Sequence, residues 1–265
     1  MSAALRERVW KKQLQQIARA DIPSVEFQTF RHRWATASEP VRATCVAADG
    51  AERNYVIKGK YDQIRQFCNE QIVALCGRLV GAPVAALAEA TVTDADKAGE
   101  PRIAHLVVDP CHAVEYVPYT TERDDNVLKH TDLAQNRARY AALEVLYSWM
   151  GCGGDHQFFY DDEPPQLVYS FDHGLFFPQN GNWTSATLDP NQFVAIDPYF
   201  VAAHLVSDER QGPVDRLRRV RPVEICRVVA SPPPSWGLTD DDRYAMCTYL
   251  VTRRRVVLDA YGAIL

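Results

Sequence analysis

Two aspartates lie at the ends of a segment that the sequence predicts to fold back on itself. Asp155 follows the glycine-rich stretch 151–154, and Asp172 closes a short apolar run before a His-Gly pair. The acidic, proline-containing turn 161–165 between them predicts a hairpin. A hairpin of this size brings both carboxylates to one end, where they suit a divalent metal and a reacting hydroxyl. Taken alone, Asp beside Gly is equally typical of an ordinary turn.

Lys58 and Glu70 supply the other charges of a phosphoryl-transfer site. Lys58 lies near the end of a β-branched run, and Glu70 lies in a segment with helical spacing of apolar residues. Transfer from ATP needs a cation on the phosphates, a carboxylate that orients it, metal ligands and a carboxylate beside the attacking hydroxyl. Lys58 and Glu70 fit the first two roles, Asp155 fits the base, and Asp172 fits the metal ligand. Each alone is more simply a solvated charge, but the four in this order favour the site.

The elements that must position these residues begin with a sheet. Strands are predicted at 24–31, 41–48 and 54–60, joined by the turn 32–40 and by the hairpin signal Asp49-Gly50. Around them we expect an N-terminal helix at 5–18, a helix at 61–80, a strand or loop at 84–92, a polar surface loop at 93–100, a fifth apolar run at 103–108 and a connector at 111–118. The three strands are expected to be antiparallel.

The second half of the chain reads as mostly helical. It begins with a polar loop at 120–132, and helical patterns follow at 133–150, in part of 190–206, and at 222–229. Thr239 and Asp242 form a capping box for a last helix that extends to about residue 261. We therefore expect an α+β protein with a two-lobed, protein-kinase-like fold. The N-lobe (1–118) has a small antiparallel sheet and one key helix, a hinge lies near 114–118, and the C-lobe (119–265) is mostly helical.

Composition excludes several classes of function. The 265 residues are 47% hydrophobic with a net charge of −5, so no strongly basic face for nucleic acid is implied. No apolar run approaches the roughly 18 residues of a membrane span, and the basic, amphipathic N-terminus is unlike a signal peptide. The clusters 218–219 and 253–255 are expected to be solvated arginines on helix faces.

Seven scattered cysteines without a C-x-x-C pair argue against a zinc site and a disulfide framework. They favour a reducing compartment, and the cytoplasm is the simplest location. Cys152 lies in the glycine-rich bend, yet no His or Asn partner can be named for it. It is expected to be a small filler.

Several segments together resemble the HipA-like kinases, which share the ground plan of protein and lipid kinases. The similar segments, within about 32–177, are 55–58 (Tyr-Val-Ile-Lys), 69–74 (Asn-Glu-Gln-Ile-Val-Ala), 79–84 (Leu-Val-Gly-Ala-Pro-Val), 154–157 (Gly-Asp-His-Gln) and 171–177 (Phe-Asp-His-Gly-Leu-Phe-Phe). The resemblance implies an ATP- and Mg²⁺-dependent kinase. Lys58 would hold the α- and β-phosphates and pair with Glu70, and Asp172 would ligate magnesium.

The resemblance also implies how the rest of the nucleotide is held. The turn 33–40 would cover the phosphates, and because it contains no G-x-G, its backbone amides and the Thr36 or Ser38 hydroxyl would replace a glycine-rich loop. Backbone groups of Glu115, Tyr116 and Val117 would meet adenine. His156 is expected to pack against its neighbours and to hydrogen-bond to the backbone. His173 is expected to shape the loop that carries the metal ligand Asp172.

The catalytic segment departs from the family pattern at one position. An asparagine commonly follows the catalytic aspartate by five residues as a second metal ligand, and Tyr160 stands there instead. Gln157 is the nearest amide, and Asp161 is a weaker substitute. Either Gln157 ligates the metal in a shortened loop, or the protein binds nucleotide and transfers phosphate poorly.

Two functions therefore remain open. The first is a kinase that phosphorylates a protein Ser/Thr or a small-molecule hydroxyl, and the second is a nucleotide-binding pseudokinase that acts as a scaffold or switch. Transfer of AMP rather than phosphate is also open, and the sequence does not indicate the acceptor.

Overall fold

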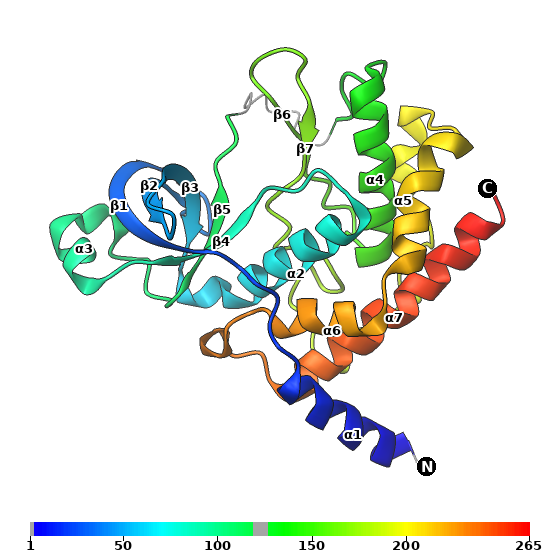
Figure 1. Ribbon diagram of the computed structural model, residues 1–265, viewed down its shortest axis with the longest axis horizontal. Helices are drawn as coiled ribbons and strands as arrows, with labels where there is room; N and C mark the ends of the chain where they lie inside the picture. Colours follow the sequence, from blue (N-terminus) through cyan, green and yellow to red (C-terminus); the bar gives the residue numbers. More distant parts are fainter. Residues whose placement is uncertain (1–2, 119–126) are drawn as a thin grey trace.

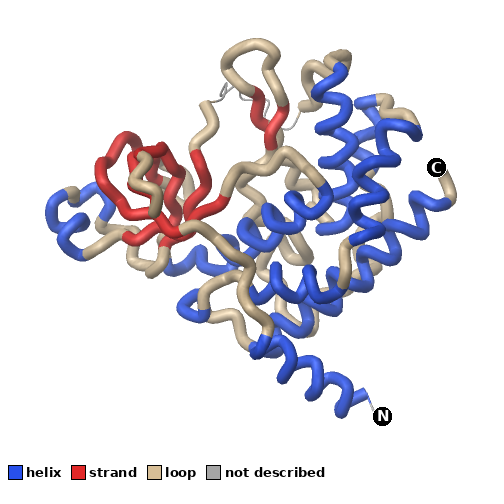
Figure 2. Tube along the Cα trace, in the orientation of Figure 1, coloured by secondary structure: helices blue, strands red, loops and turns tan. Residues whose placement is uncertain are grey.

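Five strands close into a small barrel that lies beside a larger group of helices in the computed structural model (Figures 1 and 2). The structure describes residues 3–118 and 127–265. The strands are β1 (Ser24–Arg33), β2 (Val41–Ala47), β3 (Glu52–Lys58), β4 (Leu87–Thr91) and β5 (Cys111–Glu115), and they follow the order β1-β2-β3-β5-β4. The first three predicted strands are confirmed, with ends that differ by two residues at most.

The expectation of a wholly antiparallel sheet is wrong, because β4 pairs in parallel with β1 and closes the barrel. Val25 lies opposite Ala90 in this pairing. The long strand β1 reaches β2 as well, with register shifts between Phe27 and Thr29 and between Phe30 and His32. Such bulges bend and twist a strand, so that β1 can pair with β2 on one side and with β4 on the other.

The segment between β4 and β5 also differs from expectation. The predicted polar loop at 93–100 contains the short helix α3 (Asp94–Gly99), which starts with a capping box of Thr93 and Asp96. The apolar run 103–108 is not a strand; Ile103 and Leu106 instead fill the barrel interior. β5 forms from the first half of the predicted connector. Residues 120–126 of the expected polar loop lie outside the described residues.

The main helices are α1 (Ala3–Gln16), α2 (Ile64–Val80), α4 (Ala134–Met150), α5 (Ser207–Arg219), α6 (Pro222–Ala230) and α7 (Asp240–Gly262). Short 3-10 segments occupy Tyr61–Gln63, Pro101–Ile103, Pro198–Ala203 and Pro234–Trp236. The predicted helices 61–80 and 133–150 are confirmed, as is the capping box of Thr239 and Asp242. α5 was not expected. None of the helices in the described ranges has both the length and the apolar composition that a membrane crossing requires.

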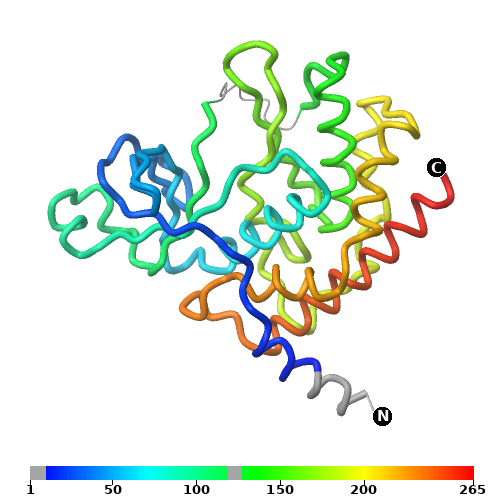
Figure 3. Tube along the Cα trace, viewed as in Figure 1, coloured from blue at the N-terminus to red at the C-terminus, as the bar shows by residue number. Residues whose placement is uncertain are grey.

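Two apolar cores organise these elements, one inside the barrel and one among the helices. α2 belongs to the helical core, where it packs against α4, α5 and α6. Figure 3 follows the chain from α1, which lies against α6 and α7, to the first strand of the barrel. α1 and α2 thus pack against helices of the C-terminal half, although both precede the lobe boundary predicted at residue 118. α2 therefore connects the barrel to the helical core.

The arginine cluster 253–255 is not a solvated face throughout, because Arg253 is fully buried. Its guanidinium donates to the carbonyl oxygens of Ser148, at the end of α4, and of Pro190, Phe193 and Val194. An arginine with its donors bound to carbonyls can be buried without unsatisfied groups. Arg253 therefore fixes the segment 190–194 against α4 and α7.

Candidate functional site

Most of the predicted site residues line one cavity of about 400 Å³. Its walls come from the turn after β1, from β3, from α2 and from the two segments that flank the β6–β7 hairpin (Phe159–Tyr160 and Val168–Tyr169). The predicted residues on these walls are Thr36, Ser38, Lys58, Glu70, Asp155, Gln157 and Asp172. The hairpin predicted around the turn 161–165 is confirmed, and it brings the two aspartates to this cavity.

Lys58 joins two carboxylates from opposite sides of the cavity. Its ammonium donates to Glu70 Oε1 at 2.6 Å and to Asp172 Oδ1. Burial disfavours the charged ammonium, but the two carboxylates outweigh this cost and raise the pKa of Lys58 above its usual range. Burial likewise opposes the charge on Glu70, but Lys58 and His112 lower the pKa of Glu70 to about 2. The cavity therefore holds a fixed cation between two carboxylates.

His112 is a residue of this site that the sequence analysis missed. It lies on β5 directly opposite Lys58 in the barrel, and its Nε2 is 3.1 Å from Glu70 Oε2. The side chain is fully buried. Glu70 is thus held between Lys58 and His112, which fixes the carboxylate that orients the lysine.

Asp155 presents an unpaired oxygen in the cavity. Its Oδ1 accepts a hydrogen bond of 2.7 Å from Gln157 Nε2. Its Oδ2 is buried and has no hydrogen-bond partner among the described residues. Burial, together with the charge of Asp172, raises the pKa of Asp155, although the bond from Gln157 opposes this. An orphaned carboxylate oxygen of this kind is ready to accept a proton or a hydroxyl hydrogen bond from a ligand.

The position expected for a second metal ligand holds a structural tyrosine. The Tyr160 hydroxyl is bonded to Tyr140 at 2.7 Å and donates to the Val127 carbonyl at 2.7 Å. Asp161 does not line the cavity, and its amide closes the hairpin turn through the Leu167 carbonyl. Gln157 does line the cavity, and it bonds Asp155 through its nitrogen, which leaves the carbonyl oxygen on the same amide.

The loop that carries Asp172 is fastened to α2. The Asn69 amide donates to the carbonyl oxygens of Gly174 and Gly181, at 2.8 and 2.9 Å, and accepts from Trp183 Nε1. A Cβ on Gly174 would lie 2.9 Å from Gln66 Cβ, so glycine permits this close approach. Asn69, one residue before Glu70, thereby sets the distance between the Glu70 helix and the Asp172 loop.

A buried polar chain connects the Asp172 loop to the segment that carries Asp155 and Gln157. His173 Nε2 lies 2.7 Å from Ser170 Oγ, which lies 2.6 Å from the Tyr147 hydroxyl. The Tyr147 hydroxyl in turn donates to the Gln157 carbonyl at 3.0 Å. His173 therefore braces the loop from within, and burial lowers its pKa to about 3. Tyr147 and Ser170 had no sequence signal beyond their place in this segment.

The neutral state of His173 makes stability depend on pH. An unfolded histidine takes up a proton near pH 6.5, whereas folded His173 does so only near pH 3. Between these values the unfolded chain binds the extra proton, so His173 lowers the free energy of unfolding as pH falls, by about 1.4 kcal/mol per pH unit. His173→Asn, measured by urea unfolding from pH 7 to 4.5, is expected to show a shallower loss than the wild type.

The exposed His204 supplies the matched control for this experiment. Because His204 has a positive φ, which asparagine tolerates, His204→Asn is expected to keep the wild-type slope. Equal slopes for His173→Asn and the wild type would contradict the buried neutral state of His173.

The predicted turn 33–40 contributes residues to the cavity wall, whereas the predicted hinge residues 115–117 do not. Thr36 and Ser38 lie on the cavity wall, in a turn closed by the bond from the Trp34 amide to the Pro40 carbonyl. The hinge residues 115–117 do not line the cavity. The amides of Glu115 and Tyr116 donate to the Ala86 and Asn54 carbonyls, so these two amides are already bonded, and the contact of residues 115–117 with adenine stays a prediction.

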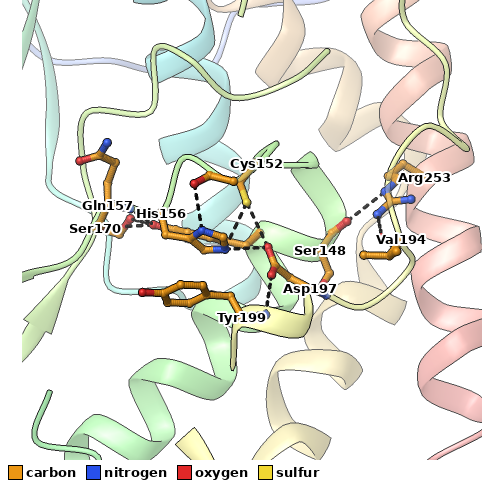
Figure 4. Close-up of polar contacts among 11 residues, drawn as sticks. Ser148, Cys152, His156, Gln157, Ser170, Val194, Asp197, Tyr199 and Arg253 are labelled. Carbon is orange, nitrogen blue, oxygen red and sulfur yellow. Dashed lines mark hydrogen bonds and ion pairs between the residues drawn. The ribbon is translucent and has the colours of Figure 1, made fainter. Parts of the chain in front are cut away.

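Cys152 is not merely a filler, and the partner that the sequence analysis could not name is His156. Cys152 Sγ lies 3.5 Å from His156 Nε2 and donates to Asp197 Oδ2 at 3.0 Å (Figure 4). His156 bonds to the Gly154 carbonyl, as expected for backbone contact, but also lies 3.0 Å from Asp197 Oδ2. Asp197 was not singled out from the sequence.

Comparison with solved structures gives distant similarity to structures of CtTel1. The chain is 15% identical to the structure "FAT and kinase domain of CtTel1", with a TM-score of 0.39, over 90% of this chain and 22% of that one. For "Complete CtTel1 dimer with C2 symmetry" the identity is 14% and the TM-score 0.41, over 90% and 12%. The chain thus spans less than a quarter of the length of these proteins. No family model and no curated protein matches the sequence.

Proposed function

We propose that this chain is an ATP- and Mg²⁺-dependent phosphotransferase of the HipA-like type, acting on a protein Ser/Thr or a small-molecule hydroxyl. The observation that carries the proposal is the convergence of Lys58, Glu70 and Asp172 on a cavity that also holds the unpaired oxygen of Asp155. These are the charges that phosphoryl transfer requires, and they come from the segments that resemble the family.

The residues fit Mg²⁺ and ATP on the chemistry of their donors. Asp172 offers a carboxylate whose side chain is 55% exposed, and Gln157 offers an amide oxygen, both of which suit magnesium. Bound magnesium would neutralise charge on the phosphates. Lys58 would hold phosphate oxygens, kept in place by Glu70, and the Thr36 and Ser38 hydroxyls would bind phosphate from the turn above.

Asp155 would orient the attacking hydroxyl and take its proton. The oxygen that would do this is Oδ2, since Oδ1 already accepts from Gln157. Because burial raises the pKa of Asp155, its carboxylate is a better proton acceptor than an exposed aspartate. A loose transition state asks for orientation more than for a strong base, which an aspartate can provide.

A nucleotide-binding pseudokinase is the alternative that one observation favours. Tyr160 is committed to bonds with Tyr140 and Val127, so it cannot act as the second metal ligand. Magnesium would then depend on Asp172 and Gln157 alone. In this case the cavity would bind ATP and signal its presence without turnover.

Thermal denaturation with nucleotide, combined with product analysis, tests the proposal. ATP with Mg²⁺ is expected to stabilise the protein by about 2.7 kcal/mol at one hundred times its dissociation constant, and ATP with EDTA by much less. Incubation with γ-labelled or α-labelled ATP then identifies the transferred group, since a kinase moves only the γ label. Stabilisation without turnover supports the pseudokinase, and transfer of the α label supports AMP transfer. The absence of any nucleotide effect would contradict all three.

A further inference from the structure

A second cluster of chemically capable side chains lies beside the catalytic segment and outside the nucleotide cavity. Cys152, His156 and Asp197 are all buried, and their Sγ, Nε2 and Oδ2 atoms converge (Figure 4). The three separations are 3.0 Å from sulfur to Oδ2, 3.5 Å from sulfur to Nε2, and 3.0 Å from Nε2 to Oδ2. Neither the proposed base nor the proposed magnesium ligands belong to this group.

We propose that this cluster is a binding site for one zinc-like divalent cation. A thiolate, an imidazole and a carboxylate are the donors that zinc takes in proteins. Tetrahedral bonds of about 2.3 Å to sulfur and about 2.0–2.1 Å to nitrogen and oxygen place such donors roughly 3.3–3.6 Å apart. The donors in the structure need to separate by only about half an ångström to reach this geometry.

The remaining polar atoms of the cluster are already engaged in the way metal ligands require. His156 Nδ1 faces the Gly154 carbonyl at 3.2 Å, and because a carbonyl only accepts, Nδ1 must carry the proton. Asp197 Oδ1 accepts from the Tyr199 amide at 2.9 Å. With Nδ1 bonded to a carbonyl, Nε2 is the ring nitrogen that faces Asp197 Oδ2, and the 3.0 Å between these two atoms can be bridged by a proton or by a cation. Outer hydrogen bonds of this kind orient metal ligands.

The structure leaves space for a fourth ligand. The three residues line a cavity of about 450 Å³, and Gly153, Gly154 and Val194 also line it. These last three residues are exposed, so the cavity has an exposed rim through which an ion or water can enter. A site with three protein ligands and an open position is typical of zinc that also binds water or a small ligand.

Bound metal would join two segments that are distant in sequence. Cys152 and His156 flank Asp155, whereas Asp197 begins the 3-10 segment Pro198–Ala203, next to the stretch that Arg253 holds. Coordination would therefore tie the catalytic segment to this anchored stretch. The site is independent of nucleotide, so its test does not depend on kinase activity.

Cobalt substitution of the full chain tests the proposal. Protein stripped of metal under reducing conditions and titrated with Co²⁺ is expected to bind one equivalent, with visible bands of tetrahedral cobalt and a thiolate-to-cobalt charge-transfer band. Zn²⁺ should displace the cobalt. Cys152→Ser is expected to lose the charge-transfer band and to bind at least about tenfold more weakly, because the thiolate is the strongest donor of the three.

Two further variants separate this site from other thiols and from folding defects. Cys226→Ser removes a buried thiol of α6, far from the loop in sequence, and is expected to keep the full spectrum. Asp197→Asn retains an oxygen for the Tyr199 amide and is expected to weaken cobalt binding with the circular dichroism unchanged. Failure of the wild-type protein to bind Co²⁺, or binding without a charge-transfer band, would overturn the proposal. The cluster would then be a hydrogen-bonded pair of His156 and Asp197 only.

Discussion

Replacement of Asp172 with asparagine is expected to reduce Mg²⁺-dependent phosphoryl transfer by at least about 10²-fold while leaving the fold intact. Asparagine retains an oxygen that can accept from Lys58, but it removes the negative charge that would hold magnesium. Glu70 still neutralises the buried Lys58 ammonium in this variant, so the fold is expected to remain intact. The measurements are γ-phosphate transfer at saturating ATP and the thermal midpoint of the same preparations.

An acidic residue of the same hairpin gives the matched control. Asp162 is exposed in the turn and does not line the cavity, so Asp162→Asn should keep wild-type transfer. The Asp172→Asn protein should also lose the difference between ATP stabilisation with Mg²⁺ and with EDTA. Full transfer in Asp172→Asn would rule out this residue as the metal ligand.

The parts of the site that the sequence predicted are those fixed by local pattern. Lys58 ends a β-branched strand, and Glu70 follows on a helix twelve residues later, so their order in the chain already limited where they could lie. The turn between the two hairpin strands likewise placed Asp155 and Asp172 at one end. Such features depend on the residue types of turns and on the spacing of apolar side chains, and both can be recognised in a short stretch of sequence.

The parts that were missed depend on contacts between distant segments. His112 reaches Glu70 only because β5 pairs with β3, and the barrel closes only because β4 pairs in parallel with β1. A one-residue change of register would turn His112 to the other face, and no local pattern sets that register. Asp197 meets His156 across forty-one positions in the same way.

Arg253 is a different kind of error, because a signal was present. It lies four residues after Tyr249, three after Leu250 and four before Val257, all of them buried. Helical spacing therefore places Arg253 on the apolar face of α7, whereas Arg255 is exposed. When the three arginines are treated as one cluster, the helical spacing that distinguishes Arg253 from Arg255 is lost.

Removal of Lys58 is expected to separate the role proposed for this residue in phosphoryl transfer from its structural role. Lys58→Met leaves Glu70, which is only 3% exposed, without its cationic partner and with the His112 imidazole as its remaining polar neighbour in the pair described above. Breaking a buried pair in this way typically costs about 3–5 kcal/mol, because one charge is left uncompensated. Phosphoryl transfer should also fall by at least about 10²-fold, since the cation on the phosphates is gone.

The double variant Lys58→Met/Glu70→Gln distinguishes the two effects. Glutamine removes the uncompensated charge, so the double variant should unfold at a higher urea concentration than Lys58→Met alone, which makes the two substitutions non-additive. Transfer should stay lost in the double variant, because restored stability does not restore a cation beside Asp172. Two outcomes would contradict this account of the site: recovery of transfer together with stability, which would make Lys58 structural only, or additive losses of stability, which would mean that Lys58 and Glu70 do not act as a pair.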